Sequence, residues 1–264
     1  MNALFERVGT VRIPVRDIQK SVDWYTKKLG MQVLHKAKGQ VELQVCGRET
    51  VLILTAANPF EPVDYLYRKG MVTHFNFNTL DAELAHMMLK DKEIVVTDIL
   101  DADFLKCFAF QDLDGNVLSV CYEKEHSMFY QPITESPISL FDRIEAVFIL
   151  VRDLPKTLDW YLHLPGLELL KDWKEGADLK VGDGETIVTL IQVDDFTPQP
   201  TSYFEFTTAD IEKTHAFLQR MDDSVSEIQE SEQARSCVVK DPEGNMLGVR
   251  SQRIASEIIR ICPT

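Results

Sequence analysis

The chain has 264 residues, 45% of them hydrophobic and 27% charged, which suits one large or two ordinary globular domains. Its 28 Lys and Arg against 42 Asp and Glu give a formal charge of −14, which argues against nucleic-acid and anionic-membrane partners. No apolar run reaches the ~20 residues of a membrane span, and the start MNALFERVGTVR has no secretory-signal pattern. The five cysteines form no C-x-x-C pair, which excludes a zinc finger or disulfide scaffold and predicts a cytoplasmic protein.

The first predicted elements form a strand–helix–strand–strand–strand unit. Val11, Ile13 and Val15 alternate with other residues, which predicts a strand. Asp17 is placed to cap a helix that Gly30 closes. Three short strand-like runs follow, in the order MQVLHK, VELQVC and TVLILT.

The same order of elements then recurs along the chain. It starts again at residues 72–78, with a helix at 81–91 and strands near IVVTDI, CFAFQD and VLSVCY. It begins a third time at residue 144 and a fourth time at 202–208, where the helix covers 210–221. The sequence therefore predicts four βαβββ units.

The third unit repeats the first. Residues 11–36 align without a gap on 147–172, and eleven of these twenty-six positions are identical, including the Arg-Asp pair and the Trp-Tyr pair. DLDGNVL at 112–118 likewise resembles DPEGNML at 241–247. The chain is therefore a duplication.

The duplication sets the predicted domains. We expect domain 1 at residues 1–124, a linker at 125–139, domain 2 at 140–254 and a C-terminal tail at 255–264. Each domain is expected to be a pair of units forming a curved mixed sheet with its helices outside, in an α+β fold with two eight-stranded sheets. Whether units pair within a half, or exchange between halves or subunits, is left open.

These patterns resemble the vicinal oxygen chelate superfamily, which includes glyoxalase I, bleomycin-resistance proteins and extradiol dioxygenases. The resemblance rests on VRDIQKSVDWYTKKLG, VRDLPKTLDWYLHLPG and the D-x-[DE]-G-N turns, and it covers nearly the whole chain. It implies that paired units form cups. It also implies that metal-using members place His or Gln early in a unit's first strand and Glu in its last strand.

The residues at those metal-ligand positions are poor donors. By unit they are Thr10 and Ile53, His74 and Ser119, Ala146 and Thr189, and Tyr203 and Gly248. His74 alone matches the pattern. A slip of one residue would gain only Glu145, which would then face away from the cup. We therefore predict no stoichiometric metal and no cofactor, and the sequence assigns no catalytic residue.

Residues on the cup faces are the candidate ligand-binding residues. In the first cup we expect Arg12, His74, Asn76 and Ser119 to meet the polar or anionic part of a ligand. In the second cup we expect an apolar wall of Phe148, Leu150, Ile191 and Tyr203, with Glu205 and Arg250 as polar points. The alternatives are that Arg12 pairs with a nearby carboxylate, that His74 is structural, and that Glu205 and Arg250 satisfy each other.

Three functions remain open at this stage. Missing metal ligands favour a protein that binds an unidentified small molecule in a cup. The resemblance implies, as the alternative, a metal-dependent glyoxalase- or extradiol-dioxygenase-type enzyme, a lyase, isomerase or dioxygenase. The third is a duplicated domain that mainly builds an oligomer such as a homodimer.

Overall fold

The computed structural model describes residues 3–130, 139–221, 224–231 and 234–252. Part of the predicted linker and the whole predicted tail at 255–264 lie outside these residues. None of the helices in the described ranges is long and apolar enough to cross a membrane.

The four predicted units are present. The first half of the chain contains β1 (Arg7–Val15), α1 (Ile18–Leu29), β2 (Gln32–Ala37), β3 (Gln40–Gln44), β4 (Val51–Ala56), β5 (Phe75–Asn78), α2 (Ala82–Asp91), β6 (Leu100–Asp101), β7 (Leu105–Gln111) and β8 (Val117–Glu123). The second half contains β9 (Arg143–Val151), α3 (Leu154–Leu162), β10 (Leu167–Trp173), β11 (Gly176–Val181), β12 (Ile187–Gln192), β13 (Phe204–Thr207), α4 (Ile211–Met221), β14 (Gln229–Glu230), β15 (Ala234–Lys240) and β16 (Met246–Gln252).

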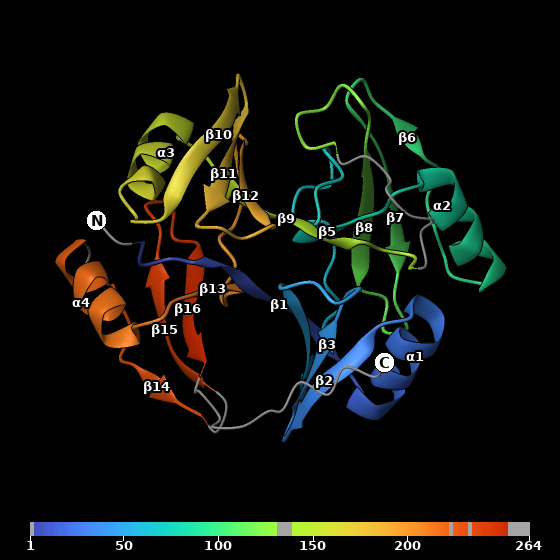
Figure 1. Cartoon of the computed structure of the whole chain (residues 1–264), viewed down its shortest axis with the longest axis horizontal. Coiled ribbons are helices and arrows are strands. Elements are labelled where there is room, and N and C mark those ends of the chain that lie inside the picture. The colour runs from blue at the N-terminus through green and yellow to red at the C-terminus, as the bar shows by residue number, and fades with distance from the viewer. Residues whose placement is uncertain (1–2, 131–138, 222–223, 232–233, 253–264) are drawn as a thin grey trace, which may run out of the picture.

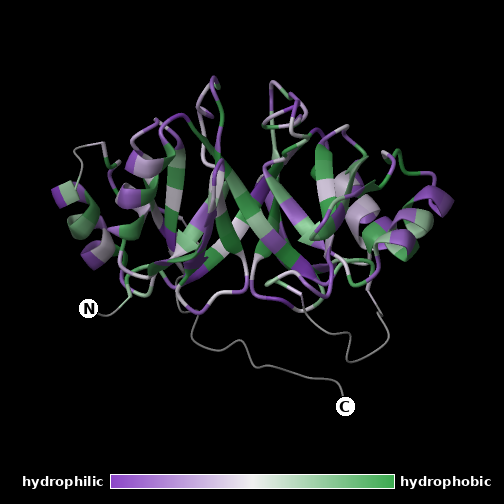
Figure 2. Cartoon of the chain, turned by 90° about the horizontal axis from the view of Figure 1, so that it is seen from above, coloured by the Kyte–Doolittle hydropathy of each residue, from purple (hydrophilic) through white to green (hydrophobic). Residues whose placement is uncertain are grey.

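The strands form two eight-stranded mixed sheets with the helices on their outer sides, as the sequence predicted (Figures 1 and 2). The units pair across the halves. One sheet has the order β14-β15-β16-β13-β1-β4-β3-β2 and joins the fourth unit to the first; we call its concave face the terminal cup. The other has the order β10-β11-β12-β9-β5-β8-β7-β6 and joins the third unit to the second; its concave face is the middle cup. The sequence left the pairing of the units open, and the structure pairs them across the two halves.

Local signals in the sequence place the helices. The side chain of Asp17 accepts a hydrogen bond from the backbone of Lys20 at 3.1 Å and caps α1, and Gly30 ends the helix with a φ of 76°. Asp153 caps α3 in the same way. Both caps are at the positions that the repeat predicted.

The D-x-x-G-N turns hold neighbouring sheets together. The carboxylate of Asp112 accepts bonds from the backbone of Asn116 and, at 2.7 Å, from the hydroxyl of Tyr25 on α1. Asp241 accepts from Tyr161 on α3 at 3.2 Å. Because Asp112 and Tyr25 belong to different sheets, each half of the chain links the terminal-cup sheet to the middle-cup sheet.

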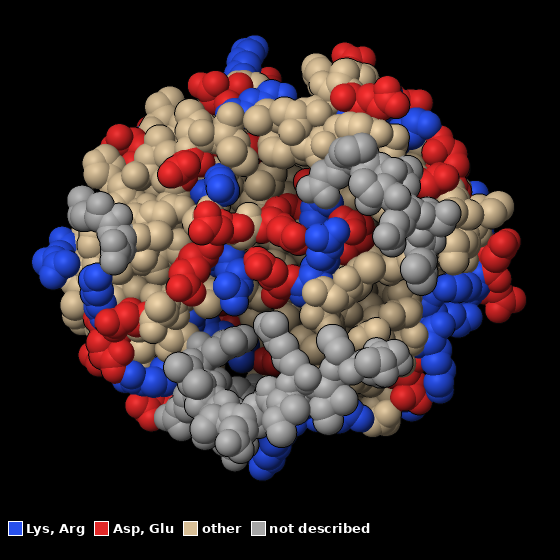
Figure 3. Space-filling model, in the orientation of Figure 1, with Lys and Arg blue, Asp and Glu red and all other residues tan. Residues whose placement is uncertain are grey.

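A second set of contacts joins the sheets near their centre. The hydroxyls of Thr50 and Thr186, which are equivalent in the repeat, lie 2.7 Å apart. The guanidinium of Arg48, just before β4, pairs with Asp142 at 2.7 Å and with Glu185 at 2.9 Å. On the face drawn in Figure 3, acidic and basic side chains are interspersed near the centre, so the excess negative charge is not gathered in one patch there.

Candidate functional site

Charged side chains pair with one another across the terminal cup. Glu205 on β13 accepts a hydrogen bond from the hydroxyl of Thr10 at 2.8 Å and pairs with Arg12 at 2.9 Å. Arg250 on β16 pairs with Glu42 on β3 at 2.8 Å and lies 3.8 Å from Glu205. Thr10, Glu205 and Arg250 are buried. These groups satisfy one another, which is the alternative that the sequence left open for Arg12 and for the Glu205–Arg250 pair.

The middle cup is open. A cavity of about 460 Å³ lies against β9, β11 and β12, and a smaller one of about 180 Å³ lies against β7 and β8. Both are lined by Asn76, Leu105 and Phe148, so they adjoin on the same concave face.

Aromatic and aliphatic side chains form most of the wall of the larger cavity. They are Phe104, Leu105, Phe129, Phe148, Trp173, Ile187 and Ile191. Phe104 and Trp173 are 51% and 40% exposed, so apolar surface continues to the cavity mouth. Apolar surface of this kind loses contact with water when a ligand covers it, which favours binding of an apolar group.

Buried carboxyl groups supply the polar part of the cavity. Asp178 on β11 accepts a hydrogen bond from the hydroxyl of Thr189 at 2.7 Å, and burial raises its pKa to about 6. Burial also raises the pKa of Glu123, although its hydrogen bond from Ser127 opposes that shift. Lys171 lies directly across the β10–β11 ladder from Asp178, with its ammonium 5.0 Å from the ring centre of Phe104.

Glu145 enters this cavity because of a β-bulge. The β5–β9 pairing shifts register between Asn76–Ala146 and Phe77–Ile144, which leaves Glu145 as the additional residue. Its side chain therefore lines the cavity together with Ala146, and the prediction that Glu145 faces away from the cup is wrong. The corresponding residue of the first unit is Gly9, whose added Cβ would lie 2.0 Å from the hydroxyl oxygen of Thr207.

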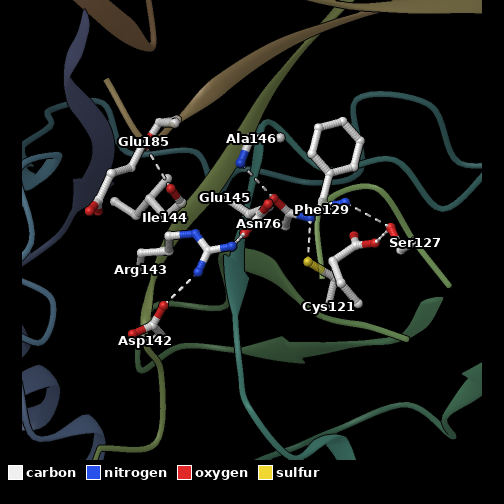
Figure 4. A network of polar contacts seen from close by, with 12 residues as sticks. Asn76, Cys121, Ser127, Phe129, Asp142, Arg143, Ile144, Glu145, Ala146 and Glu185 are labelled. Carbon is white, nitrogen blue, oxygen red and sulfur yellow. Dashed lines mark hydrogen bonds and ion pairs between the residues drawn. The ribbon is translucent and has the colours of Figure 1, made fainter. Parts of the chain in front are cut away.

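The Glu145 carboxylate is held by one guanidinium. Arg143 pairs with Glu145 at 2.5 Å and with Asp142 at 2.6 Å, and Figure 4 shows the guanidinium between the two carboxylates. Burial raises the pKa of Glu145 to about 7, although the charge of Arg143 opposes this effect.

Asn76 fixes the floor of the middle cup. Its side-chain oxygen accepts a bond from the backbone of Ala146 at 2.9 Å, and its amide donates to the sulfur of Cys121 at 3.0 Å (Figure 4). Cys107 lies directly opposite Cys121 in the β7–β8 ladder. Burial raises the pKa of both thiols, so they are protonated at neutral pH.

His74 and Tyr203 lie where the two sheets meet. Their rings make an edge-to-face contact with centres 4.7 Å apart, and the Tyr203 hydroxyl donates to the backbone carbonyl of Phe148. Burial lowers the pKa of His74 to about 4, partly offset by a hydrogen bond with the Gln199 side chain, and its Nδ1 atom is buried without a hydrogen-bond partner. His74 is therefore neutral at pH 7 and packs against Tyr203.

The predicted site residues are thus divided among three places. Asn76, Ser119 and Phe148 line the middle cup; Arg12, Glu205 and Arg250 lie in the terminal cup; and His74 and Tyr203 lie between the sheets. The prediction that Arg12, His74 and Asn76 share one cup floor is wrong, because the first and second units belong to different sheets.

Several cavity residues were missed at the sequence level. They are Glu123, Lys171, Trp173 and Asp178. Asp178 carried a usable signal, since it is a carboxylate between the apolar residues Ala177 and Leu179.

The family's metal-ligand positions do not form a suitable donor set in the middle cup. Ser119 shares a hydrogen bond with Thr73 at 2.6 Å, Thr189 is bound to Asp178, and Ala146 has no donor atom. The register pairs Ser119 with Asn76 rather than with His74.

The terminal cup is no better suited to a metal. Ile53 and Gly248 offer no side-chain donor, and Thr10 is bound to Glu205. Among the described residues, no three His, Cys, Asp or Glu side chains are grouped so that they could hold a metal ion. The residues present do not fit the metal that the family implies.

Comparison with known proteins identifies the family. The model of the Glyoxalase/Bleomycin resistance protein/Dioxygenase superfamily matches residues 7–120 and 143–249, and the chain belongs to this superfamily. A search of curated proteins found no match.

Solved structures share the fold. Glyoxalase I from Zea mays has a TM-score of 0.67 at 17% identity, covering 93% of this chain and 92% of its own. A putative dioxygenase from Bacillus subtilis subsp. subtilis str. 168 has a TM-score of 0.66 at 12% identity, covering 94% of this chain and 86% of its own. At these identities the similarity establishes the fold alone, and the function has to be inferred from the residues of the site.

Proposed function

We propose that this protein binds a small molecule in the middle cup without a metal ion. The observation that carries the proposal is the cavity of about 460 Å³ with aromatic walls in the middle cup; in the terminal cup, by contrast, charged side chains pair with one another. Ligand pockets commonly enclose ~300–1,000 Å³ and combine apolar walls with a few polar groups. The middle cup has both properties.

Family membership alone supports the alternative of a metal-dependent lyase, isomerase or dioxygenase. The donor set argues against it. Ala146, Ile53 and Gly248 offer no side-chain donor, and the hydroxyls of Thr10, Ser119 and Thr189 are bound to neighbours. The one matching residue, His74, packs against Tyr203. Function follows from the site rather than from the fold, so binding is the better-supported conclusion.

Nile red, an uncharged apolar dye, provides the test. We expect saturable fluorescence enhancement at one dye per chain. Ile191 lines the cavity, so Ile191→Trp fills the cavity and is expected to weaken binding at least tenfold. Thr55 occupies the equivalent position in the repeat, on the terminal cup, so Thr55→Trp is the matched control and is expected to change affinity less than twofold.

The two variants separate the possible locations of the site. Equal loss of binding in both variants, or loss in Thr55→Trp alone, would overturn the assignment to the middle cup. Circular dichroism of each variant establishes that a loss of binding is not a loss of fold.

A further inference from the structure

The two cups can be compared residue by residue, because the units that form them are repeats. In the terminal cup Arg12 and Glu42 both lie beside Ile53, and in the middle cup Phe148 and Asp178 both lie beside Thr189.

The other two units correspond in the same way. Glu205 is paired with Gly248 as Asn76 is paired with Ser119. Arg250, two residues after Gly248, therefore corresponds to Cys121, two residues after Ser119.

The two cups differ in their cations. The third strand of a unit contributes a carboxylate to each cup, Glu42 to the terminal cup and Asp178 to the middle cup. In the terminal cup the Glu42 carboxylate pairs with the guanidinium of Arg250 at 2.8 Å. Its counterpart is the neutral thiol of Cys121, and the counterpart of the second guanidinium is the ring of Phe148. Phe148 lines the larger cavity together with Asp178, and Cys121 lines the smaller cavity that adjoins it.

The charges that remain around the cavity favour a cation. Asp178 and Glu123 line it, against Lys171 as the lining basic residue. Glu145 also lines it but is paired with Arg143. Arg143 contacts both Glu145 and Asp142.

Lys171 itself illustrates how a cation fits at this site. Lys171 is an exposed residue of β10 and lies opposite Asp178 in the β10–β11 ladder. Its ammonium lies over the Phe104 ring. Aromatic faces attract cations, and Phe148 and Trp173 offer further rings in the same cavity.

We infer that the ligand of the middle cup is an organic cation, an amine or amidine on an apolar body, whose charged group takes beside Asp178 the place that Arg250 takes beside Glu42. This inference rests on the proposed function and adds the chemical class of the ligand. The apolar body lies against Phe148, Trp173 and Ile191, and the buried carboxylate of Asp178 supplies a charge-assisted hydrogen bond.

Three compounds with the same body test the charge. They are 4-phenylbutylamine, 4-phenyl-1-butanol and 4-phenylbutyrate, titrated calorimetrically at pH 7.5. We expect the amine to bind at least tenfold more tightly than the alcohol, and the carboxylate more weakly than either. In Asp178→Asn, which keeps an oxygen to accept the bond from Thr189, the amine and the alcohol are expected to bind within about twofold of each other. Asp183→Asn, at an exposed carboxylate, is the control and is expected to preserve the preference.

A second variant removes the internal competitor. Lys171→Gln is expected to strengthen binding of the amine severalfold and to leave the alcohol unchanged, which keeps the inference testable if Asp178→Asn does not fold. Equal affinity for amine and alcohol, tighter binding of the carboxylate, or no binding of any of the three overturns the inference. Nile red binding that is lost in Ile191→Trp still supports the proposed function in each of those outcomes, so the two failures are distinguishable.

Discussion

Replacement of Glu205 by Gln tests whether the terminal cup is held by its charges. Oε2 of this carboxylate accepts a hydrogen bond from the Thr10 hydroxyl at 2.8 Å and pairs with Arg12 at 2.9 Å. The guanidinium of Arg250 lies 3.8 Å from the same oxygen. Breaking a buried ion pair from one side costs about 3–5 kcal/mol, because a charge is left without its partner. The Arg12 side chain is 28% exposed and Arg250 keeps Glu42, so we expect the lower end, about 3 kcal/mol.

Urea unfolding at pH 7, followed by circular dichroism, measures this loss at an unchanged m-value. A double-mutant cycle with Arg12→Gln supplies the control. We expect the double variant to recover part of the loss, with a coupling energy of at least about 1 kcal/mol. A loss below about 1 kcal/mol in Glu205→Gln, with additive single variants, would refute the view that these charges hold one another in the cup.

The remaining predictions concern pH and the shape of the middle cup. The pKa of Glu145 is about 7 in the folded state against 4.5 when unperturbed, so the folded state binds the proton more tightly than the unfolded state. The free energy of unfolding therefore falls by about 3 kcal/mol as pH rises from 4.5 to 7. Thermal melts of Glu145→Gln should lack this fall. The pKa of His74 is about 4 in the folded state against 6.5 when unperturbed, so its effect has the opposite sign. The free energy of unfolding falls by up to about 3 kcal/mol as pH drops from 6.5 to 4, and His74→Gln should lose that dependence in urea titrations. An added Cβ at Gly176 would lie 2.3 Å from the Trp173 ring, so Gly176→Val should displace the ring and weaken Nile red binding severalfold while destabilising the fold by about 1–3 kcal/mol; unchanged affinity would show that the ring is not part of the site.

The units and their helix ends could be predicted from the sequence because their signals are local. The alternation of Val11, Ile13 and Val15 needs only the period of a strand, and all three residues are fully buried. Asp17 and Gly30 act on the backbone beside them, so their capping roles follow from sequence position alone.

The pairing of units could not be predicted in this way. β1 pairs with β13, and β5 pairs with β9, through strands whose core-facing residues are all apolar. Phe75 and Phe206 fill the same kind of position, and nothing in one strand specifies its partner. The pairs join strands that are far apart in the sequence, so local signals do not select the partner.

The candidate site was predicted only in part, because alternation along a strand is a local signal and the pairing of strands is not. Alternation placed Asn76, Ser119 and Phe148 on a concave face, and they line the cavities. It could not place Glu145, because a bulge reverses the side of the strand on which a residue lies. Alternation also could not show that Arg12 and His74 belong to different sheets, because the sheet to which each strand belongs depends on the pairing of units.

The most direct test of the central claim is a crystal structure of the protein in complex with Nile red. We expect the dye in the middle cup against Phe148 and Trp173, with the Glu42–Arg250 pair of the terminal cup intact. Dye bound in the terminal cup, or only on the outer surface with the middle cup closed by its own side chains, would contradict it.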